Sequence, residues 1–161
     1  MAFDESKYKI GYSIGVGGVV IHNKKVLLVR RVRGEDTGEW AIPGGFVEHK
    51  EKIENAIVRE VEEETNVKAK VEGLIAVRNR IYKDENSVYF IFLLKTSSEK
   101  FILEKIEVDK AKFFTLSEIK KLKCLQVLSD TIVTRALQGK INLLSNIPQD
   151  EFSKEKYSIF S

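Results

Sequence analysis

Residues 44–67 read GGFVEHKEKIENAIVREVEEETNV. Within this segment, Lys52 to Thr65 contains neither Gly nor Pro, is rich in Glu, and repeats apolar residues at helical spacing. Asn66 follows, and asparagine is the commonest non-glycine residue that adopts the left-handed conformation closing a helix. The segment therefore predicts a loop with two adjacent glycines that leads into a helix over residues 52–65.

The predicted helix changes character along one face. Successive helical residues are about 100° apart. The stripe that results contains Ile53, Ala56, Ile57, Glu60, Glu63 and Glu64. The apolar half should face a sheet, and the acidic side chains should converge because they stand three and four positions apart. Such acids repel each other and oppose the negative end of the helix dipole. The pattern therefore favours a bound hard cation such as Mg²⁺ over a solvated acidic face, which is the alternative.

The rest of the chain predicts a mixed sheet with helices on its faces, because strand-like and helix-like segments alternate. The expected strands are 12–21, 26–29, 40–47 (broken at Pro43 and the two glycines), 67–82, 87–95 and 111–115. The first two should form a hairpin. A second helix is expected over residues 126–139, preceded by a short helix capped by Ser117. Gly15, Gly17 and Gly18 would weaken a strand, which predicts that another group packs closely on its backbone.

The composition is typical of a globular protein with one domain. Hydrophobic residues make up 43% and charged residues 32% of the 161, and the formal net charge of +3 is too small to indicate nucleic-acid or membrane binding. A single cysteine, Cys124, excludes an intramolecular disulfide and a cysteine-based zinc site. Neither a signal-peptide pattern nor an apolar run as long as a membrane span is present in the sequence. We therefore expect a cytoplasmic protein.

The glycine pair, the loop and the helix together resemble the Nudix box. That motif has Gly, Glu, Arg-Glu, an aliphatic residue, Glu-Glu, Gly and a final aliphatic residue at fixed spacings. Here Gly45, Glu51 and residues 59–67 occupy those positions. Asn66 replaces the last glycine, and Lys50 stands where many members of the family have glycine. Asparagine meets the same backbone requirement as glycine at the end of a helix.

The resemblance extends from about residue 14 to residue 119 and implies an α/β fold, an α/β/α sandwich around a mixed sheet. We expect a single domain over residues 1–161, with its core at about 11–139 and a C-terminal tail at 140–161. The resemblance also implies Mg²⁺-dependent hydrolysis of a nucleoside diphosphate linked to another moiety, with Mn²⁺ as a substitute. The partner is then a small-molecule nucleotide substrate, and the oligomeric state stays open, a homodimer included.

The resemblance is strongest to the branch of the family that acts on ADP-ribose and NADH. Residues 16–20, 76–80 and 156–160 carry this similarity, which is scattered and rests on no single diagnostic motif. A pyrophosphatase that removes oxidised nucleoside triphosphates is the enzymatic alternative. A nucleotide-binding regulator without catalysis is an alternative of another class, and the intact set of carboxylates argues against it.

The resemblance also implies roles for single residues. The implied metal ligands are Gly45, Glu60, Glu63 and Glu64. Glu51 and Arg59 would form a pair that braces the loop, and Glu48 corresponds to a position that sometimes supports the metal site. The catalytic base stays open between a glutamate of the box, Glu60 or Glu63, and a later acid. That later region holds Glu104, Glu107 and Asp109, of which Glu107 best matches an acidic position of the family.

Substrate-binding residues are expected on the strands. Arg30 and Arg31 end one strand, and one of them should face the site because neighbouring strand residues point in opposite directions. Arg31 matches a frequent substrate-binding position. Arg78 and Arg80 share one strand face and could hold a phosphate or a ribose. Strand aromatics offer weaker candidates for base stacking, since most such residues are core residues: Tyr82, Tyr89, Phe90 and Phe92.

Overall fold

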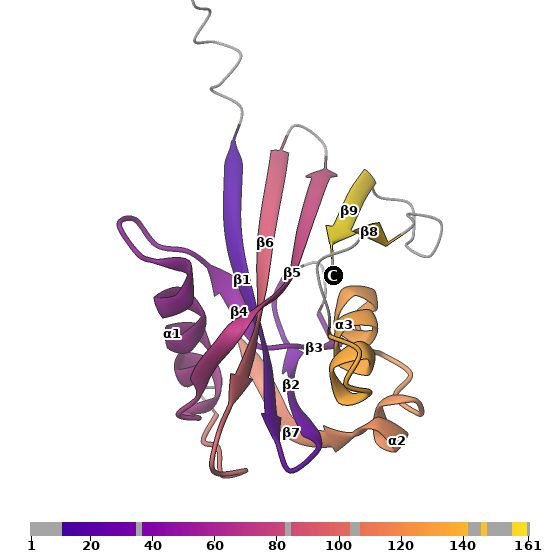
Figure 1. Ribbon diagram of the computed structural model, residues 1–161. Coiled ribbons are helices and arrows are strands. Elements are labelled where there is room, and N and C mark those ends of the chain that lie inside the picture. Colours follow the sequence, from indigo (N-terminus) through magenta and orange to yellow (C-terminus); the bar gives the residue numbers. More distant parts are fainter. Residues whose placement is uncertain are drawn as a thin grey trace, which may run out of the picture.

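The computed structural model describes residues 11–34, 37–82, 85–103, 107–141, 146–147 and 156–160, with backbone alone for Tyr82 and for the last two segments. Within these residues the chain forms one mixed sheet with helices on both of its faces (Figure 1). The elements are β1 (Tyr12–His22), β2 (Lys25–Arg31), β3 (Trp40–Ala41), β4 (Gly44–Phe46), α1 (Ile53–Thr65), β5 (Lys70–Tyr82), β6 (Glu85–Lys95), β7 (Val108–Thr115), α2 (Leu116–Ile119), α3 (Val127–Leu137), β8 (Asn146–Ile147) and β9 (Lys156–Phe160). The expected α/β class and mixed sheet are confirmed.

The sheet has the order β3-β2-β1-β6-β5-β9-β8, and β4 and β7 pair off this path with β1 and β2. β1 runs parallel to β6, whereas β2 and β4 run antiparallel to β1. The expected hairpin of β1 and β2 turns through Asn23 and Lys24, whose φ angles are 47° and 61°. Two left-handed residues are typical of a tight two-residue hairpin, because their twist matches that of the strands.

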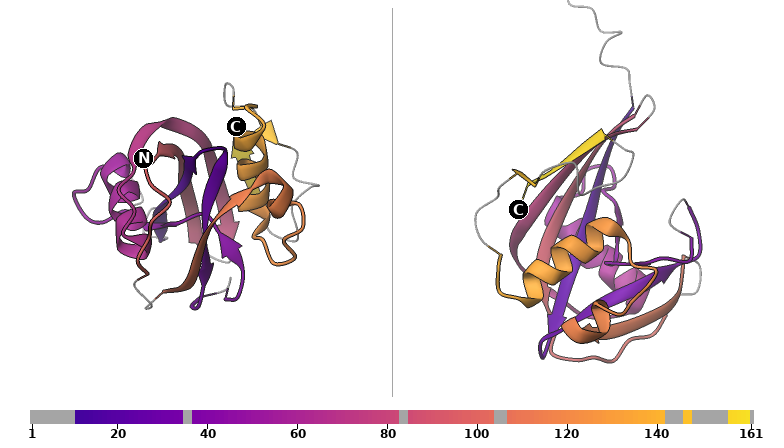
Figure 2. Two further views of the ribbon diagram at one scale, coloured as in Figure 1. Left: turned by 90° about the horizontal axis from the view of Figure 1, so that it is seen from below. Right: turned by 90° about the vertical axis from the view of Figure 1, so that its right-hand side faces the viewer.

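Two helices cover opposite faces of the sheet, α1 on one and α3 on the other (Figures 1 and 2). α1 contributes the fully buried Ile57 and Val61 to an apolar cluster that includes Phe92 of β6. α3 contributes Ile132 to a second cluster with Ile91, the preceding residue of β6, which points to the other face. The layers are therefore those of the expected α/β/α sandwich.

α1 ends as its sequence predicts. Asn66 follows the last helical residue with φ 54°, and its N–H donates to the carbonyl oxygen of Glu62 at 2.6 Å. In the loop before the helix, Lys50 has φ 63°. The lysine thus adopts the left-handed conformation that suits glycine, at a cost of roughly 1 kcal/mol or more. The loop keeps a glycine-like backbone in spite of the substitution from the family pattern.

The cap of α2 differs from the expectation, which was Ser117. The N-cap is Thr115, whose hydroxyl accepts from the N–H of Glu118 at 3.4 Å, while the Glu118 carboxylate accepts from the N–H of Thr115 at 2.8 Å. This reciprocal arrangement is a capping box, which satisfies two N–H groups at once. Ser117 is followed three residues later by Lys120 and offers no such second bond, so the cap lies two residues earlier than expected.

The C-terminal region extends the sheet. β9 pairs antiparallel with β5, from Ile81 opposite Lys156 to Val77 opposite Phe160, and β8 pairs with β9. β5 is therefore an inner strand of the sheet, with β6 on one side and β9 on the other (Figure 1).

Candidate active site

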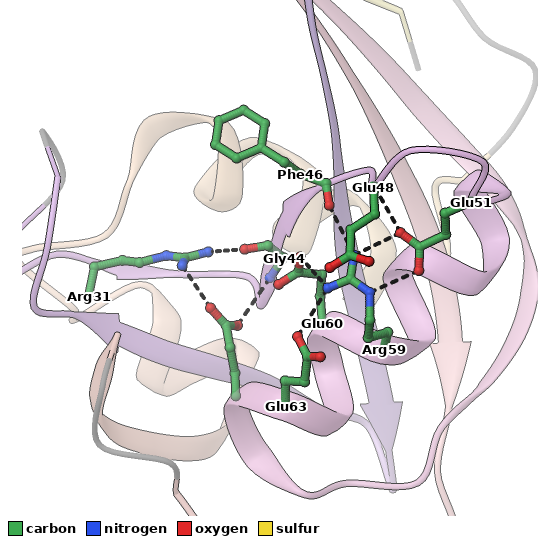
Figure 3. A network of polar contacts seen from close by, with 9 residues as sticks. Arg31, Gly44, Phe46, Glu48, Glu51, Arg59, Glu60 and Glu63 are labelled. Atoms are coloured by element: carbon green, nitrogen blue, oxygen red, sulfur yellow. Dashed lines mark hydrogen bonds and ion pairs between the residues drawn. The ribbon is translucent and has the colours of Figure 1, made fainter.

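β4 begins with Gly44 and Gly45, directly after the bend at Pro43, and this start of the strand is called the glycine turn below. Gly44 lies beside the acidic side chains of α1 (Figure 3), and Gly45 lies against Glu60. A Cβ atom on Gly45 would lie 2.5 Å from each carboxylate oxygen of Glu60, so a side chain there would displace that carboxylate. Gly44 has φ 156°, and a Cβ atom on it would lie 2.1 Å from the carbonyl oxygen of Val16. Two glycines in succession therefore let the backbone of β4 approach both β1 and the acidic end of α1.

Glu64 is the most deeply buried acid of this site, with 5% of its surface exposed. Its carboxylate pairs with the Arg31 guanidinium at 2.7 Å and accepts from the N–H of Gly44 at 3.1 Å. Arg31 also donates to the carbonyl oxygen of Gly44. Burial raises the pKa of Glu64 to about 7, and it outweighs the opposite effects of Arg31 and of the Gly44 N–H. The protein thus holds a carboxylate where its charged form is disfavoured.

Arg59 organises the other acids (Figure 3). Its guanidinium donates to Glu60 at 2.9 Å, to Glu63 at 3.0 Å and to both carboxylate oxygens of Glu51 at 2.8 Å. It also donates to the carbonyl oxygen of Phe46 at 3.0 Å. Arg59 therefore ties the loop to the helix through the Glu51 pair that the sequence suggested.

The two acids at the ends of this network differ in their pKa. The hydrogen bond from Arg59 lowers the pKa of Glu51 to about 2, with a further contribution from the N–H of Glu48. Burial instead raises the pKa of Glu60, against the effect of Arg59. Glu60 and Glu64 are thus the two acids of the site whose ionised form is disfavoured by burial.

The expected convergence of three carboxylates is not present in this arrangement. In the described part of the chain, no group of three or more His, Cys, Asp or Glu side chains lies close enough together to hold a metal ion. Two arginines account for the difference. Arg59 draws Glu60 and Glu63 to one side, while Arg31 holds Glu64 on the other.

The donors nevertheless suit a hard divalent cation. Glu64 is buried, the Glu60 side chain is 12% exposed and that of Glu63 55% exposed, and Gly45 lies against the Glu60 carboxylate. Carboxylate and carbonyl oxygens are the ligands that Mg²⁺ takes in proteins. The residues present therefore fit the ion that the sequence predicts.

Arg31 and Glu107 lie on the same side of the site. The N–H of Val32 donates to the carbonyl oxygen of Glu107 at 2.9 Å, and the charge of Glu107 contributes to the raised pKa of Glu64. Arg30 points away and pairs with Asp109, with Nε at 2.8 Å from a carboxylate oxygen. Of the two neighbouring arginines, Arg31 is thus the one at the site. Glu104 lies outside the described residues.

The other expected substrate residues are spread over the surroundings. Glu48 is exposed on the loop before α1. Arg78 and Arg80 stand in β5 opposite Tyr89 and Ser87 of β6, and Arg78 donates to the Ser87 hydroxyl at 3.1 Å. The remaining aromatic candidates lie elsewhere, because Phe90 and Phe92 belong to the cluster under α1. The side chain of Tyr82 lies outside the described part.

Sequence reasoning missed the central role of Gly44. Its N–H donates to Glu64 and its carbonyl oxygen accepts from Arg31, so this one residue holds the carboxylate and the guanidinium together. The glycine pair after Pro43 indicated a close backbone approach. It did not indicate which side chains would bind the N–H and C=O groups of Gly44, because that depends on how β2, β4 and α1 pack.

A cavity of about 550 Å³ lies along the outer side of α1. It is lined by Glu51, Asn55, Val58, Arg59, Glu62 and Glu63. Its volume is in the range of sites for small-molecule ligands. The Arg59 network therefore forms part of the wall of this open depression.

Comparison with known proteins gives the same family throughout. The NUDIX domain model matches residues 11–135. The ADP-ribose pyrophosphatase of Methanocaldococcus jannaschii is 32% identical over 123 residues, which are 74% of this chain and 72% of that protein. Nudix hydrolase 8 of Arabidopsis thaliana is 34% identical over 112 residues, which are 66% of this chain but 30% of that longer protein.

Solved structures agree in fold. The MutT NUDIX hydrolase of Burkholderia pseudomallei has a TM-score of 0.67 at 24% identity, with 81% of this chain and 98% of that chain covered. A UDP-X diphosphatase has a TM-score of 0.63 at 27% identity, covering 86% of this chain and 73% of that chain. With the family model matched over most of its length, and with the glycine turn, the Arg59 network and the buried acids in place, this chain belongs to the Nudix hydrolase family.

Proposed function

We propose that this protein hydrolyses the diphosphate linkage of a nucleoside diphosphate joined to a second moiety, with ADP-ribose or an NADH-like dinucleotide as substrate. The observation that carries the proposal is that Glu60 and Glu64 lie beside the glycine turn, where desolvation raises the pKa of both acids although each pairs with an arginine. The similarity to an archaeal ADP-ribose pyrophosphatase over 74% of the chain supports this substrate class.

Mg²⁺, with Mn²⁺ as a substitute, is the proposed cofactor. Glu60, Glu63, Glu64 and the carbonyl oxygen of Gly45 would hold it. When bound, the ion neutralises phosphate oxygens and makes a water molecule more acidic. The arginine network has a separate part, because Arg59 fixes the loop and the helix relative to each other through Glu51.

The protein's own side chains then bind the substrate and move a proton. Arg31, Arg78 and Arg80 supply positive charge for phosphate oxygens or ribose hydroxyls, with Glu48 at the edge of the site. A water molecule attacks phosphorus, and a carboxylate must accept its proton. The candidates for this base are Glu60, Glu63 and Glu107.

A substrate panel tests the proposal. ADP-ribose, NADH, nucleotide sugars and oxidised deoxynucleoside triphosphates are incubated with the protein and Mg²⁺, and the products are identified. We expect AMP and ribose 5-phosphate from ADP-ribose. Preference for the oxidised triphosphates would replace the substrate but keep the reaction, whereas nucleotide binding without turnover in any metal would indicate a regulator and contradict the proposal.

A matched pair of variants tests the acids. Glu63→Gln should lower kcat by about 100-fold or more, equivalent to roughly 3 kcal/mol of transition-state stabilisation. Glu62→Gln is the control, since the adjacent Glu62 pairs with Lys68 instead of Arg59. Full activity of Glu63→Gln, with the control also active, would remove Glu63 from the site.

A cytoplasmic location completes the proposal, and the oligomeric state stays open between a monomer and a homodimer. None of the described helices is both long and apolar enough to cross a membrane. Light scattering of the purified protein measures the mass of the particle in solution and so decides between one copy and two.

A further inference from the structure

Four residues on four neighbouring strands form one row across the sheet. Arg78 of β5 is opposite Tyr89 of β6, Tyr89 is opposite Gly15 of β1, and Gly15 is opposite Phe46 of β4. Residues directly opposite each other point to the same face of a sheet, with strands about 4.8 Å apart. The row therefore leads from the glycine turn of the site to an arginine on a more distant strand.

Tyr89 fills the space that two glycines leave in this row. A Cβ atom on Gly15 or on Gly17 would lie 2.6 Å from carbon atoms of the Tyr89 ring. This is the close approach that the glycines of β1 predict. At its far end the hydroxyl of Tyr89 lies 2.6 Å from where a Cβ atom of Gly44 would be. Tyr89 is thus packed on the same residue that Arg31 and Glu64 bind.

Arg78 is held on this ring. Its guanidinium carbon lies over the Tyr89 ring, 5.0 Å from the centroid, and a terminal nitrogen donates to Ser87 at 3.1 Å. A guanidinium on an aromatic ring keeps its planar arrangement of donors for a ligand. Tyr89 therefore lies between two arginines. Its hydroxyl end packs on Gly44, which Arg31 binds, and its ring carries Arg78.

We propose that Tyr89 is a positioning residue, which holds Arg78 so that it binds the phosphate group farther from the acids of α1. This inference rests on the proposed function, because it takes the ligand to be a nucleoside diphosphate derivative. The planar donors of an arginine suit two oxygens of one phosphate. Because this phosphate is present before and during the reaction, the contact contributes to binding in both states, and its loss raises KM more than it lowers kcat.

Kinetics of three variants with ADP-ribose test the positioning role. Tyr89→Leu removes the ring under Arg78, and Arg78→Lys removes the planar donors. Each should raise KM about 10-fold or more while kcat changes less than about 3-fold. Tyr89→Phe retains the ring and should restore most of the affinity. Phe90→Leu is the control, because it removes a neighbouring ring that points to the opposite face.

The coupling between the two residues gives a sharper test. The Tyr89→Leu/Arg78→Lys double variant should have nearly the KM of either single variant, because both changes remove one interaction. Gly15→Ala should also raise KM, because its methyl group would displace the Tyr89 ring. Gly73→Ala is the control, because no atom lies within 4 Å of a Cβ atom at that position. Independent, multiplying effects on KM, or equal losses in kcat, would overturn the inference.

Binding of ADP separates this inference from the proposed function. Calorimetry with ADP and Mg²⁺ is done with the parent protein and with each Tyr89 variant, so that the proposed metal ligands are intact. Weaker binding with Leu than with Phe supports the inference, even where ADP-ribose proves not to be hydrolysed. Equal affinity for all variants, or no measurable binding of ADP, overturns it whatever the hydrolysis assay shows.

Discussion

Glu64 at the end of α1 and Glu118 at the start of α2 have similar partners but opposite pKa shifts. Each accepts one backbone N–H bond and pairs with one cation, Arg31 for Glu64 and Lys112 for Glu118, and Glu118 also accepts from the Thr115 hydroxyl at 2.9 Å. Burial raises the pKa of Glu64 to about 7, whereas the hydrogen bond from Lys112 lowers that of Glu118 to about 2.

Burial is the difference between the two regions. The Glu118 side chain is 40% exposed, while that of Glu64 is 5% exposed. Near the surface, an acid at a helix start stabilises the helix through its cap. The same group inside the protein loses its hydration, and its hydrogen bonds do not compensate for the hydration free energy that is lost. An acid in the position of Glu64 therefore opposes stability, which is typical of a residue kept for function.

The largest expected effect of this difference is on catalysis. Glu64→Gln should lower kcat/KM by about 100-fold or more, because the site loses a negative ligand group, while Glu118→Gln should leave it within about 2-fold. Steady-state hydrolysis of the best substrate in Mg²⁺ measures both. If the two variants lose activity equally, the contrast between a functional and a structural acid is wrong.

The two acids should also give opposite dependences of stability on pH. Glu64 has its pKa raised in the folded state, so it binds protons that the unfolded chain has released, and stability falls as the pH rises from about 4.5 to about 7. This fall is up to about 3 kcal/mol for a shift of this size. Glu118 has a lowered pKa, so its stabilisation is present above about pH 4.5 and is lost as the pH falls towards 2.

Denaturant unfolding of three proteins over this pH range measures these slopes. Relative to the parent, Glu64→Gln should reduce the fall in the free energy of unfolding between pH 4.5 and 7, with a part left because the pKa of Glu60 is also raised. Glu118→Gln should reduce the fall below pH 4.5, with a part left because the pKa of Glu51 is also lowered. Unchanged slopes in either variant would show that its carboxyl does not titrate as described.

The smallest expected effect concerns the cap alone. Thr115→Ala should lower the free energy of unfolding by about 1 kcal/mol, because it removes the hydroxyl half of the capping box. Ser117→Ala is the control and should change stability less, since Ser117 lies within α2 and not at its cap. Hydrolysis by both variants should remain at the parental level. A larger loss for Ser117→Ala would place the cap where the sequence first suggested it.

Local patterns predicted the parts of the fold that local physics determines. The helix 52–65 is visible in its apolar spacing, and its end at Asn66 follows from the left-handed preference of asparagine. The cap of α2 was misplaced although its Thr-x-x-Glu pattern is local. A serine two residues later offered a competing signal that only the capping-box rule distinguishes.

The site itself could be predicted only as a set of residues. Helical spacing grouped Glu60, Glu63 and Glu64, but it did not show that Arg59 and Arg31 divide them. The hydrogen bonds of Gly44 to Glu64 and Arg31 depend on how β4, α1 and β2 pack together. The contact of Tyr89 with Gly15 depends on the parallel register of β1 and β6, which pairs residues 74 positions apart and leaves no local signal.

Calorimetric titration of Mg²⁺ into the parent protein, Glu64→Gln and Glu118→Gln tests most directly that the buried acids of α1 form a metal site. We expect the parent and Glu118→Gln to bind the ion with similar affinity. The affinity of Glu64→Gln should be lower by about 10-fold or more. Equal affinity in all three proteins, or no binding to the parent, would contradict a metal site at the end of α1.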